Sequence, residues 1–378
     1  MLNVYLNRFW QANDIAMKDN CFNPEATQVA MGMRMAEECI FDELGEKGEP
    51  WGNNPPELMA RLCRQYNDKA EKITGRRLLD EKYPKNHEIF PKIKMIGEVF
   101  GGNYAYKNGT FWLEECIATP QDLEAALDRV DKLDIRSFIL PEHWETAKKQ
   151  IFETTGQTLD LLRYGRRVRG PVTLAMSLCK IENIIFWMED YPDLVHRFFD
   201  TIERVILQYV DIVNQEAGEE KVKNEHSRMG FRFFDDNCCM LSPELYEEYA
   251  YPLLKHVFDK VCPNKEDYRY QHSDSEMSHL LPILGRLNFT AVNFGPTVLA
   301  DQIRKYMPNA RIDGCLSPMT FLSNNDDDII AEVKRDCEMS KEFNFRGLCI
   351  DTAGSINFGT KLTSMLAVMY AIQEYGQF

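Results

Sequence analysis

The chain has 378 residues, of which 44% are hydrophobic and 27% are charged, a balance typical of packed globular proteins rather than of long disordered segments. Its formal net charge is -15 and it contains no run of lysines and arginines, which argues against nucleic acid and anionic membrane surfaces as partners. The length exceeds one ordinary core and suits an α/β barrel of about 200 to 250 residues with a smaller N-terminal unit.

The cysteines and the N-terminal segment predict the cellular compartment. The 11 cysteines are an odd number and include no Cys-x-x-Cys pair, which favours free thiols in a reducing environment over a disulfide framework. The segment MLNVYLNRFWQANDIAMKDN lacks a charged stretch followed by an apolar one, and no apolar run approaches the roughly 20 residues that span a bilayer. We therefore expect a soluble cytoplasmic protein with no membrane partner.

In chain order, the first segment reads as helical and the remainder as alternating strands and helices. Residues 1–110 contain polar breakers such as GEKGEPWGNNPPE but no sustained strand alternation, so they are predicted to form a helix-rich N-terminal extension or cap. Residues 111–378 are predicted to form the main domain, and from about residue 165 short β-branched or aromatic runs alternate with amphipathic segments.

The strand candidates and the helices between them predict a parallel sheet. Strands are expected at 168–176, 231–236, 268–273, 289–294, 310–315 and 345–351, and helices at 191–215, 242–261, 278–287, 298–307 and 326–343. Such alternation implies parallel strands joined by right-handed crossovers. Segments 93–100 and 135–141 could complete eight strands, which gives a (β/α)8 TIM barrel. The alternative, an open doubly wound sheet, usually carries a Gly-rich phosphate turn, and neither GxGxxG nor GxxxxGK[ST] occurs.

Polar residues follow most of the expected strands, at the ends where a barrel places its active site. They are Asp235 and Asp236, His272 and Asp274, Asn293, Asp313 with Cys315, and Asp351. Each has an ordinary structural alternative, because an Asp after a strand often caps the next helix and an Asn before Gly-Pro often forms a turn. Burying so many acids around one axis without a ligand or cation would be costly, however, and this convergence predicts a functional site.

The triplet His272-Ser273-Asp274 is the sharpest local candidate for a metal site. Two side chains separated by one residue at a strand end can reach the same ion, with the imidazole nitrogen and the carboxylate oxygen each about 2.0–2.2 Å from zinc. Asp351 or Cys315 could supply a third ligand, and a structural, hydrogen-bonded His272 is the alternative. Upstream, RYGRRVRGP contains four arginines, mostly expected as surface charge; Arg169 is the candidate for holding an acidic substrate.

Several of these segments together resemble a known family. The series RGPVTLA, EDYPDLVHRFFDTI, FFDDNCCMLSPELYEEYAYPLLKHVFD, YQHSDS, NFGP and IDG is similar to the uroporphyrinogen decarboxylase superfamily over roughly residues 110–378. That superfamily includes the heme-pathway decarboxylase and zinc methyltransferases that act on methylated corrinoid proteins and coenzyme M. The resemblance implies a (β/α)8 barrel.

Two departures distinguish the branches of that superfamily. The decarboxylases carry an N-terminal signature of the form MRQAGR, whereas MGMRMAEECIF offers only Arg34 in a different setting. The methyltransferases bind zinc through His-x-Cys and a distant Cys, and here Asp274 and Asp351 stand in those places. Carboxylates make a harder and less activating ligand set than thiolates do. Because the decarboxylase signature is absent and His272 stands where the methyltransferases need it, the resemblance favours the corrinoid methyltransferase branch.

The expected function is a methyltransferase that moves a methyl group between a small substrate and a corrinoid carried by a partner protein, with zinc assistance. The alternative is a uroporphyrinogen decarboxylase-type carboxy-lyase acting on a tetrapyrrole or other acidic substrate, and a third hypothesis is a non-catalytic binding protein. A homodimer is expected from the resemblance. The expected roles are catalysis for Asp235, Asp236 and His272, substrate binding for Asn293, Asp313 and Arg169, and metal binding for His272, Asp274 and Asp351.

Overall fold

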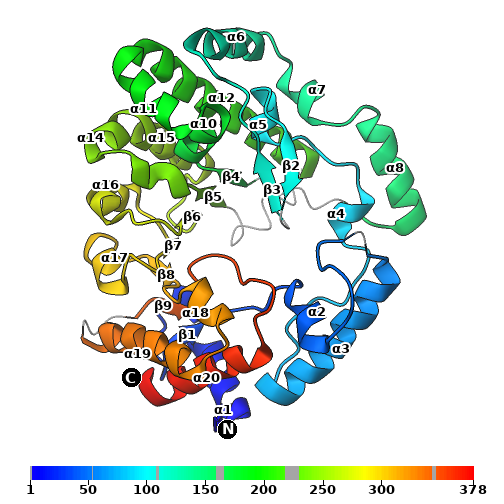
Figure 1. Cartoon of the computed structure of the whole chain (residues 1–378), viewed down its shortest axis with the longest axis vertical. Helices are drawn as coiled ribbons and strands as arrows, with labels where there is room; N and C mark the ends of the chain where they lie inside the picture. The colour runs from blue at the N-terminus through cyan, green and yellow to red at the C-terminus, as the bar shows by residue number, and fades with distance from the viewer. Residues whose placement is uncertain (1, 53, 108–109, 159–165, 218–229, 343–345) are drawn as a thin grey trace. The chain divides into compact units, whose positions relative to one another are not determined.

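The computed structural model describes the chain except for residues 1, 53, 108–109, 159–165, 218–229 and 343–345 (Figure 1). The chain divides into two compact units. The terminal unit comprises Met1–Tyr83, His272–Leu281 and Phe289–Phe378, and the central unit comprises Pro84–Gln271 and Pro282–Asn288. The predicted boundary at residues 110 and 111 stays a prediction.

The strands form a parallel sheet, as the alternation of strands and helices predicts. The seven-stranded order is β1-β9-β8-β7-β6-β5-β4, and a separate antiparallel pair joins β2 to β3. Parallel registers join β1 to β9, β9 to β8 and β8 to β7, and also β5 to β4. The strands are β1 (Ala30–Met31), β2 (Tyr104–Lys107), β3 (Thr110–Leu113), β4 (Arg167–Arg169), β5 (Gly230–Phe234), β6 (Tyr268–Ser273), β7 (Ala291–Phe294), β8 (Arg311–Asp313) and β9 (Leu348–Ile350).

The terminal unit joins the two ends of the chain. Its two-residue strand β1 pairs with β9, and the backbone N–H of Phe378 donates to the carbonyl of Thr27 (3.0 Å). Helices α19 and α20 pack beside each other (Figure 1). The helices of this unit are α1 (Leu6–Ala16), α2 (Cys39–Leu44), α3 (Pro56–Thr74), α17 (Ala300–Tyr306), α18 (Pro318–Leu322), α19 (Asp326–Glu342) and α20 (Leu362–Tyr375).

The central unit is built around the long helix α12 (Pro192–Ala217). Apolar residues recur along α12 at helical spacing, so one face is buried and the other meets solvent. Each fully buried side chain such as Val195, Phe198 or Ile202 contributes about 1.5–3 kcal/mol. The other helices are α4 (Asn86–Ile89), α5 (Ile96–Val99), α6 (Pro120–Asp131), α7 (Ile135–Ile139), α8 (Trp144–Thr155), α10 (Pro171–Cys179), α11 (Ile181–Asp190), α14 (Pro243–Leu245) and α15 (Tyr251–Val261); α16 (Leu281–Leu284) begins at the division between the units.

Most sequence-predicted elements are confirmed, and three strand predictions are wrong. The expected strand 168–176 is a strand only to Arg169, because Gly170 and Pro171 then begin helix α10. Its apolar run VTLAM lies in a buried helix, which a short apolar run alone does not distinguish from a strand. Segments 93–100 and 135–141 contain helices α5 and α7 rather than strands. Within the described residues, no helix has both the length and the apolar character needed to cross a membrane.

Candidate functional site

The carboxyl end of β5 carries two acidic residues with different surroundings. Asp235 is fully buried, and its Oδ1 accepts a hydrogen bond from the backbone N–H of Thr173 (2.8 Å) at the start of α10. Burial raises the pKa of Asp235 to about 7, against the lowering effect of this hydrogen bond. Asp236 retains exposed surface. The expected catalytic role of Asp235 stays a prediction. Its hydrogen bond from the Thr173 N–H links the end of β5 to the start of α10.

Gly170 explains why the RGP segment turns sharply here. A Cβ at Gly170 would lie 2.2 Å from the Cβ of Asp235, closer than real side chains approach. The glycine therefore allows the buried carboxyl group to pack against the turn, and Pro171 follows at the first position of α10, where its missing N–H costs nothing. Arg169 ends β4, where its Nη1 donates to Ser177 Oγ (3.0 Å). Its expected contact with substrate stays a prediction.

In the terminal unit, His272 near the end of β6 is held by Asn293 of β7. The His272 Nδ1 and Asn293 Oδ1 atoms are 2.7 Å apart, and Asn293 Nδ2 donates to the carbonyls of Asp313 (2.6 Å) and Thr352 (3.1 Å). Since these two carbonyls fix the amide orientation, Oδ1 faces the imidazole and accepts from Nδ1–H. The neutral ring then carries its lone pair on Nε2, the arrangement of a metal-binding or proton-accepting histidine.

Asn293 is 6% exposed, and its amide contacts His272 and two backbone carbonyls. Substrate binding, the role expected for it, therefore stays a prediction, because the contacts that the structure gives it orient the imidazole.

Asp313 and Asp351 lie at the ends of neighbouring strands β8 and β9. Arg311 binds both carboxylate oxygens of Asp313, with Nε–Oδ1 at 2.6 Å and Nη2–Oδ2 at 2.8 Å. Burial raises the pKa of Asp351 to about 7, and the negative charge of Asp313 adds to this effect. Asp351 therefore exchanges a proton near neutral pH, whereas Asp313 is engaged by its own strand.

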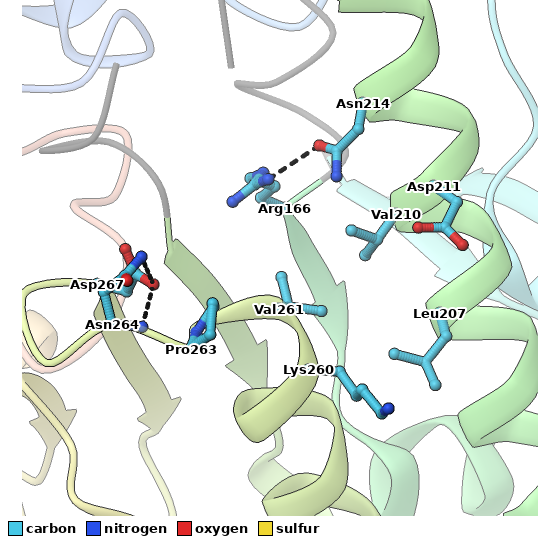
Figure 2. A pocket seen from close by; sticks show the side chains of 10 residues that line it. All are labelled: Arg166, Leu207, Val210, Asp211, Asn214, Lys260, Val261, Pro263, Asn264 and Asp267. Carbon is cyan, nitrogen blue, oxygen red and sulfur yellow. Dashed lines mark hydrogen bonds between the residues drawn. The ribbon is translucent and has the colours of Figure 1, made fainter. Parts of the chain in front are cut away.

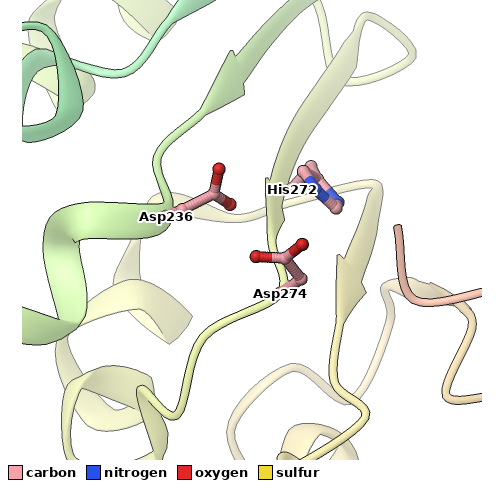
Figure 3. Close-up of side chains that lie close together, drawn as sticks. All are labelled: Asp236, His272 and Asp274. Atoms are coloured by element: carbon pink, nitrogen blue, oxygen red, sulfur yellow. The ribbon is translucent and has the colours of Figure 1, made fainter. Parts of the chain in front are cut away.

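One group of side chains fits a metal ion. Asp236, His272 and Asp274 each offer one ligand atom, and these atoms lie within 4.8 Å of one another (Figure 3). Ligand atoms of one tetrahedral zinc are roughly 3.4 Å apart when each lies about 2.1 Å from the ion. One imidazole and two carboxylates are a donor set that zinc and similar divalent ions accept. Gly354 borders this group, since a Cβ there would lie 3.4 Å from Asp274 Oδ2.

The expected ligands His272 and Asp274 belong to this group, and Asp236, expected to be catalytic, takes the third place. Asp351, expected as a ligand, is not a member. The alternative ligand Cys315 is fully buried, and its pKa is raised well above the usual value by burial, followed by the negative charge of Asp336. It is not a member of the group either.

Arg34 is a candidate that sequence reasoning underestimated. It lies three residues after β1, is exposed, and has no hydrogen bond or ion pair with any residue that the structure describes. Its positive charge lowers the pKa of Asp351, which places the two residues near each other. The sequence shows the arginine, but a strand of only two residues is too short to be predicted. Sequence alone therefore does not place Arg34 just after a strand of the sheet.

A family model and a solved structure support the fold. A family model described as Uroporphyrinogen decarboxylase (URO-D) matches residues 87–375, more than half of the chain. A solved methyltransferase from Methanosarcina mazei is similar with a TM-score of 0.56 and 16% identity, covering 92% of this chain and 94% of that one. A chain described as a candidate vitamin-B12-independent methionine synthase from Listeria monocytogenes has a TM-score of 0.42 and 11% identity, covering 92% and 97%. No curated protein matches.

Proposed function

Because the chain belongs to the uroporphyrinogen decarboxylase (URO-D) family, whose fold is the TIM barrel, we propose that it is a metal-assisted methyltransferase of that superfamily. It would move a methyl group between a small substrate and a corrinoid carried by a partner protein. The observation that carries this proposal is the grouping of Asp236, His272 and Asp274. A shared fold does not establish a shared reaction. The similarity to the Methanosarcina mazei methyltransferase therefore supports the fold, and the proposed reaction depends on the site residues.

The side chains of this group have distinct tasks in the proposed reaction. Asn293 orients the imidazole so that Nε2 presents its lone pair, and Asp236 and Asp274 supply carboxylate oxygens. A zinc ion held by these three residues would lower the pKa of a bound heteroatom of the substrate.

Metal analysis of the purified full-length chain tests the proposal. We expect about one zinc per chain in the wild type and loss of the metal in His272→Ala. The matched control is His279→Ala, because His279 is an exposed histidine seven residues further along and outside the group. Methyl transfer from methylcobalamin to a thiol, followed by cobalamin absorbance, should fail in His272→Ala and persist in the control. Wild-type protein that binds no divalent metal would contradict the proposal.

A carboxy-lyase is the second candidate, and Arg34 favours it. An exposed guanidinium near Asp351 can hold a substrate carboxylate while the protonated Asp351 donates a proton to the carbanion that decarboxylation leaves. Release of carbon dioxide from uroporphyrinogen by metal-free wild type, lost in Arg34→Gln, would support this candidate. It would also reverse the order of the two functions.

A further inference from the structure

The central unit contains a cavity that the candidate site does not use. It has a volume of about 370 Å³, within the range of small-molecule sites. Its walls come from the C-terminal half of α12, the end of α15, and the residues that precede β4 and β6 (Figure 2). It therefore lies at the amino ends of these strands. The six residues of β6 extend about 17 Å at roughly 3.3 Å per residue, which separates the cavity from His272 near the other end of the strand.

Arg166 is the unusual feature of this cavity. The residue is only 6% exposed, and its Nη2 donates to Asn214 Oδ1 (2.9 Å). Its Nε and Nη1 atoms are buried and have no hydrogen-bond partner among the residues that the structure describes. Burying a cation whose N–H groups lack acceptors is costly. A ligand that accepts hydrogen bonds from the Arg166 guanidinium would remove this cost. Burial lowers the pKa of Arg166, which is consistent with an incompletely solvated charge.

The neighbouring carboxylate does not fill this role. Asp267 is 3% exposed, and its Oδ2 accepts hydrogen bonds from the backbone N–H (2.8 Å) and the side-chain Nδ2 (3.1 Å) of Asn264. It attracts Arg166 electrostatically but forms no ion pair with it. Lys260, in the last turn of α15, adds a second positive charge to the lining. The lining thus holds two cations and two carboxylates, Asp211 and Asp267, yet neither carboxylate bonds to Arg166 among the described residues, and its Nε and Nη1 keep unused N–H groups that an added anion can satisfy.

The remaining wall is apolar apart from Asp211 of α12, whose carboxylate also lines the cavity (Figure 2). Leu207 and Val210 come from one face of α12, and Val261 and Pro263 come from the end of α15 and the loop that follows. At about 30 Å³ for each water molecule, the volume corresponds to on the order of ten waters, enough for a small organic ligand. A single inorganic ion would leave most of the apolar wall without a partner, so the cavity suits a ligand with a hydrocarbon part.

We propose that this cavity binds a small organic oxyanion, a carboxylate or phosphate monoester with a short apolar chain. The oxyanion accepts hydrogen bonds from the unused N–H groups of Arg166, and Lys260 increases the attraction. The apolar chain packs against Leu207, Val210 and Val261. The cavity shares no residue with the metal group, so its ligand is distinct from the substrate of that group.

Calorimetric titration of the full-length chain with hexanoate and with hexyl phosphate tests the proposal, with hexan-1-ol as the uncharged match. We expect at least one of the two anions to bind the wild type and hexanol to bind about tenfold or more weakly. Binding of hexanoate alone identifies a carboxylate site, and binding of hexyl phosphate alone identifies a phosphate site. Equal binding of hexanol, or no binding of either anion, would overturn the proposal.

Variants separate anion recognition from general effects. Arg166→Met should weaken anion binding about tenfold or more, and it should raise the melting temperature of the ligand-free chain because an unsatisfied charge is removed. Lys260→Gln, an exposed change that leaves the core intact, should weaken binding several-fold and serves if Arg166→Met does not fold. The control Lys255→Gln removes the same charge from the same helix outside the cavity and should bind like wild type. Wild-type affinity in Arg166→Met or Lys260→Gln would refute the assignment.

Discussion

The fully buried carboxyl group of Asp235 should make the stability of the protein depend on pH, and Asp235→Asn isolates that dependence. The substitution keeps an acceptor for the Thr173 N–H, which donates to Oδ1 in the native chain (2.8 Å). The other oxygen, Oδ2, is buried without a hydrogen-bond partner among the described residues. Asparagine therefore preserves the shape and the tether to α10 but removes the titrating group.

The magnitude follows from the pKa of Asp235, which burial raises from the usual 3.8 to about 7. At about 1.4 kcal/mol per pH unit, this difference corresponds to about 4 kcal/mol. Between pH 4 and pH 7 the folded state binds the proton more tightly than the unfolded state does. The stabilising contribution of this proton is therefore complete below about pH 4 and is lost as the pH rises through 7. Asparagine does not titrate, so the stability of Asp235→Asn should not fall in this way as the pH rises.

Urea unfolding at a series of pH values from 4 to 8 measures the effect as the difference in unfolding free energy between variant and wild type. That difference should increase by about 4 kcal/mol in favour of Asp235→Asn from the acid end to pH 8. Asp190→Asn is the matched control, because Asp190 is an exposed carboxylate at the end of α11. If the wild type and Asp235→Asn give parallel curves, the carboxyl group is not desolvated in the way its burial implies.

Three further substitutions test the packing and the site. Gly170→Ala places a Cβ 2.2 Å from a neighbouring side chain and should lower the unfolding free energy by about 1–3 kcal/mol in urea titration; an unchanged midpoint would contradict the close packing. Glu216→Gln weakens the ion pair with Lys148 (2.5 Å) and should lower the unfolding free energy by about 1–3 kcal/mol at pH 7 in urea titration. Burial opposes but does not cancel the hydrogen bonds that lower the pKa of Glu216, so this loss should disappear as the pH falls through the lowered pKa; a loss that does not change with pH would contradict the ion pair. Asn293→Leu removes the acceptor of His272 Nδ1–H and, under the proposed function, should weaken zinc binding about 10- to 100-fold; wild-type affinity would refute the positioning role.

The later strands could be predicted from the sequence because their hydrophobic pattern agrees with the residues that mark the ends of strands and the starts of helices. Strands β7 and β9 are short buried runs, and helices between the later strands have recognisable starts, such as Ser242, whose side chain accepts from the backbone of Leu245. The segment after Arg169 failed for a physical reason. Its apolar residues are buried around the helix, so α10 lacks the polar face that marks an amphipathic helix. Only the Gly-Pro pair signals that a helix begins.

The site was predicted in part, since strand ends identify candidates but not their partners. His272 follows directly from its position near the end of β6, Asp274 from its position just after that strand, and Asp236 from its position after β5. The sequence does not reveal that Arg311 binds the carboxylate of Asp313 on the same strand. Residues two apart on a strand point to the same face of the sheet, so Arg311 and Asp313 can meet. Whether they do depends on the register and burial of the strand, which only the folded chain establishes.

The two-residue strand β1 gives a weak sequence signal, although it precedes Arg34 by three residues and pairs with β9. Its pairing with β9 brings the N-terminal segment into the sheet beside the strand that ends at Asp351. The charge of Arg34 consequently reaches Asp351 and opposes the rise in pKa that burial and Asp313 cause. A cation beside a carboxyl group that titrates near neutral pH can hold an acidic substrate and keep a proton donor close to it. For this reason Arg34→Gln complements the metal analysis of His272→Ala: loss of carbon dioxide release in Arg34→Gln would favour a carboxy-lyase over a methyltransferase.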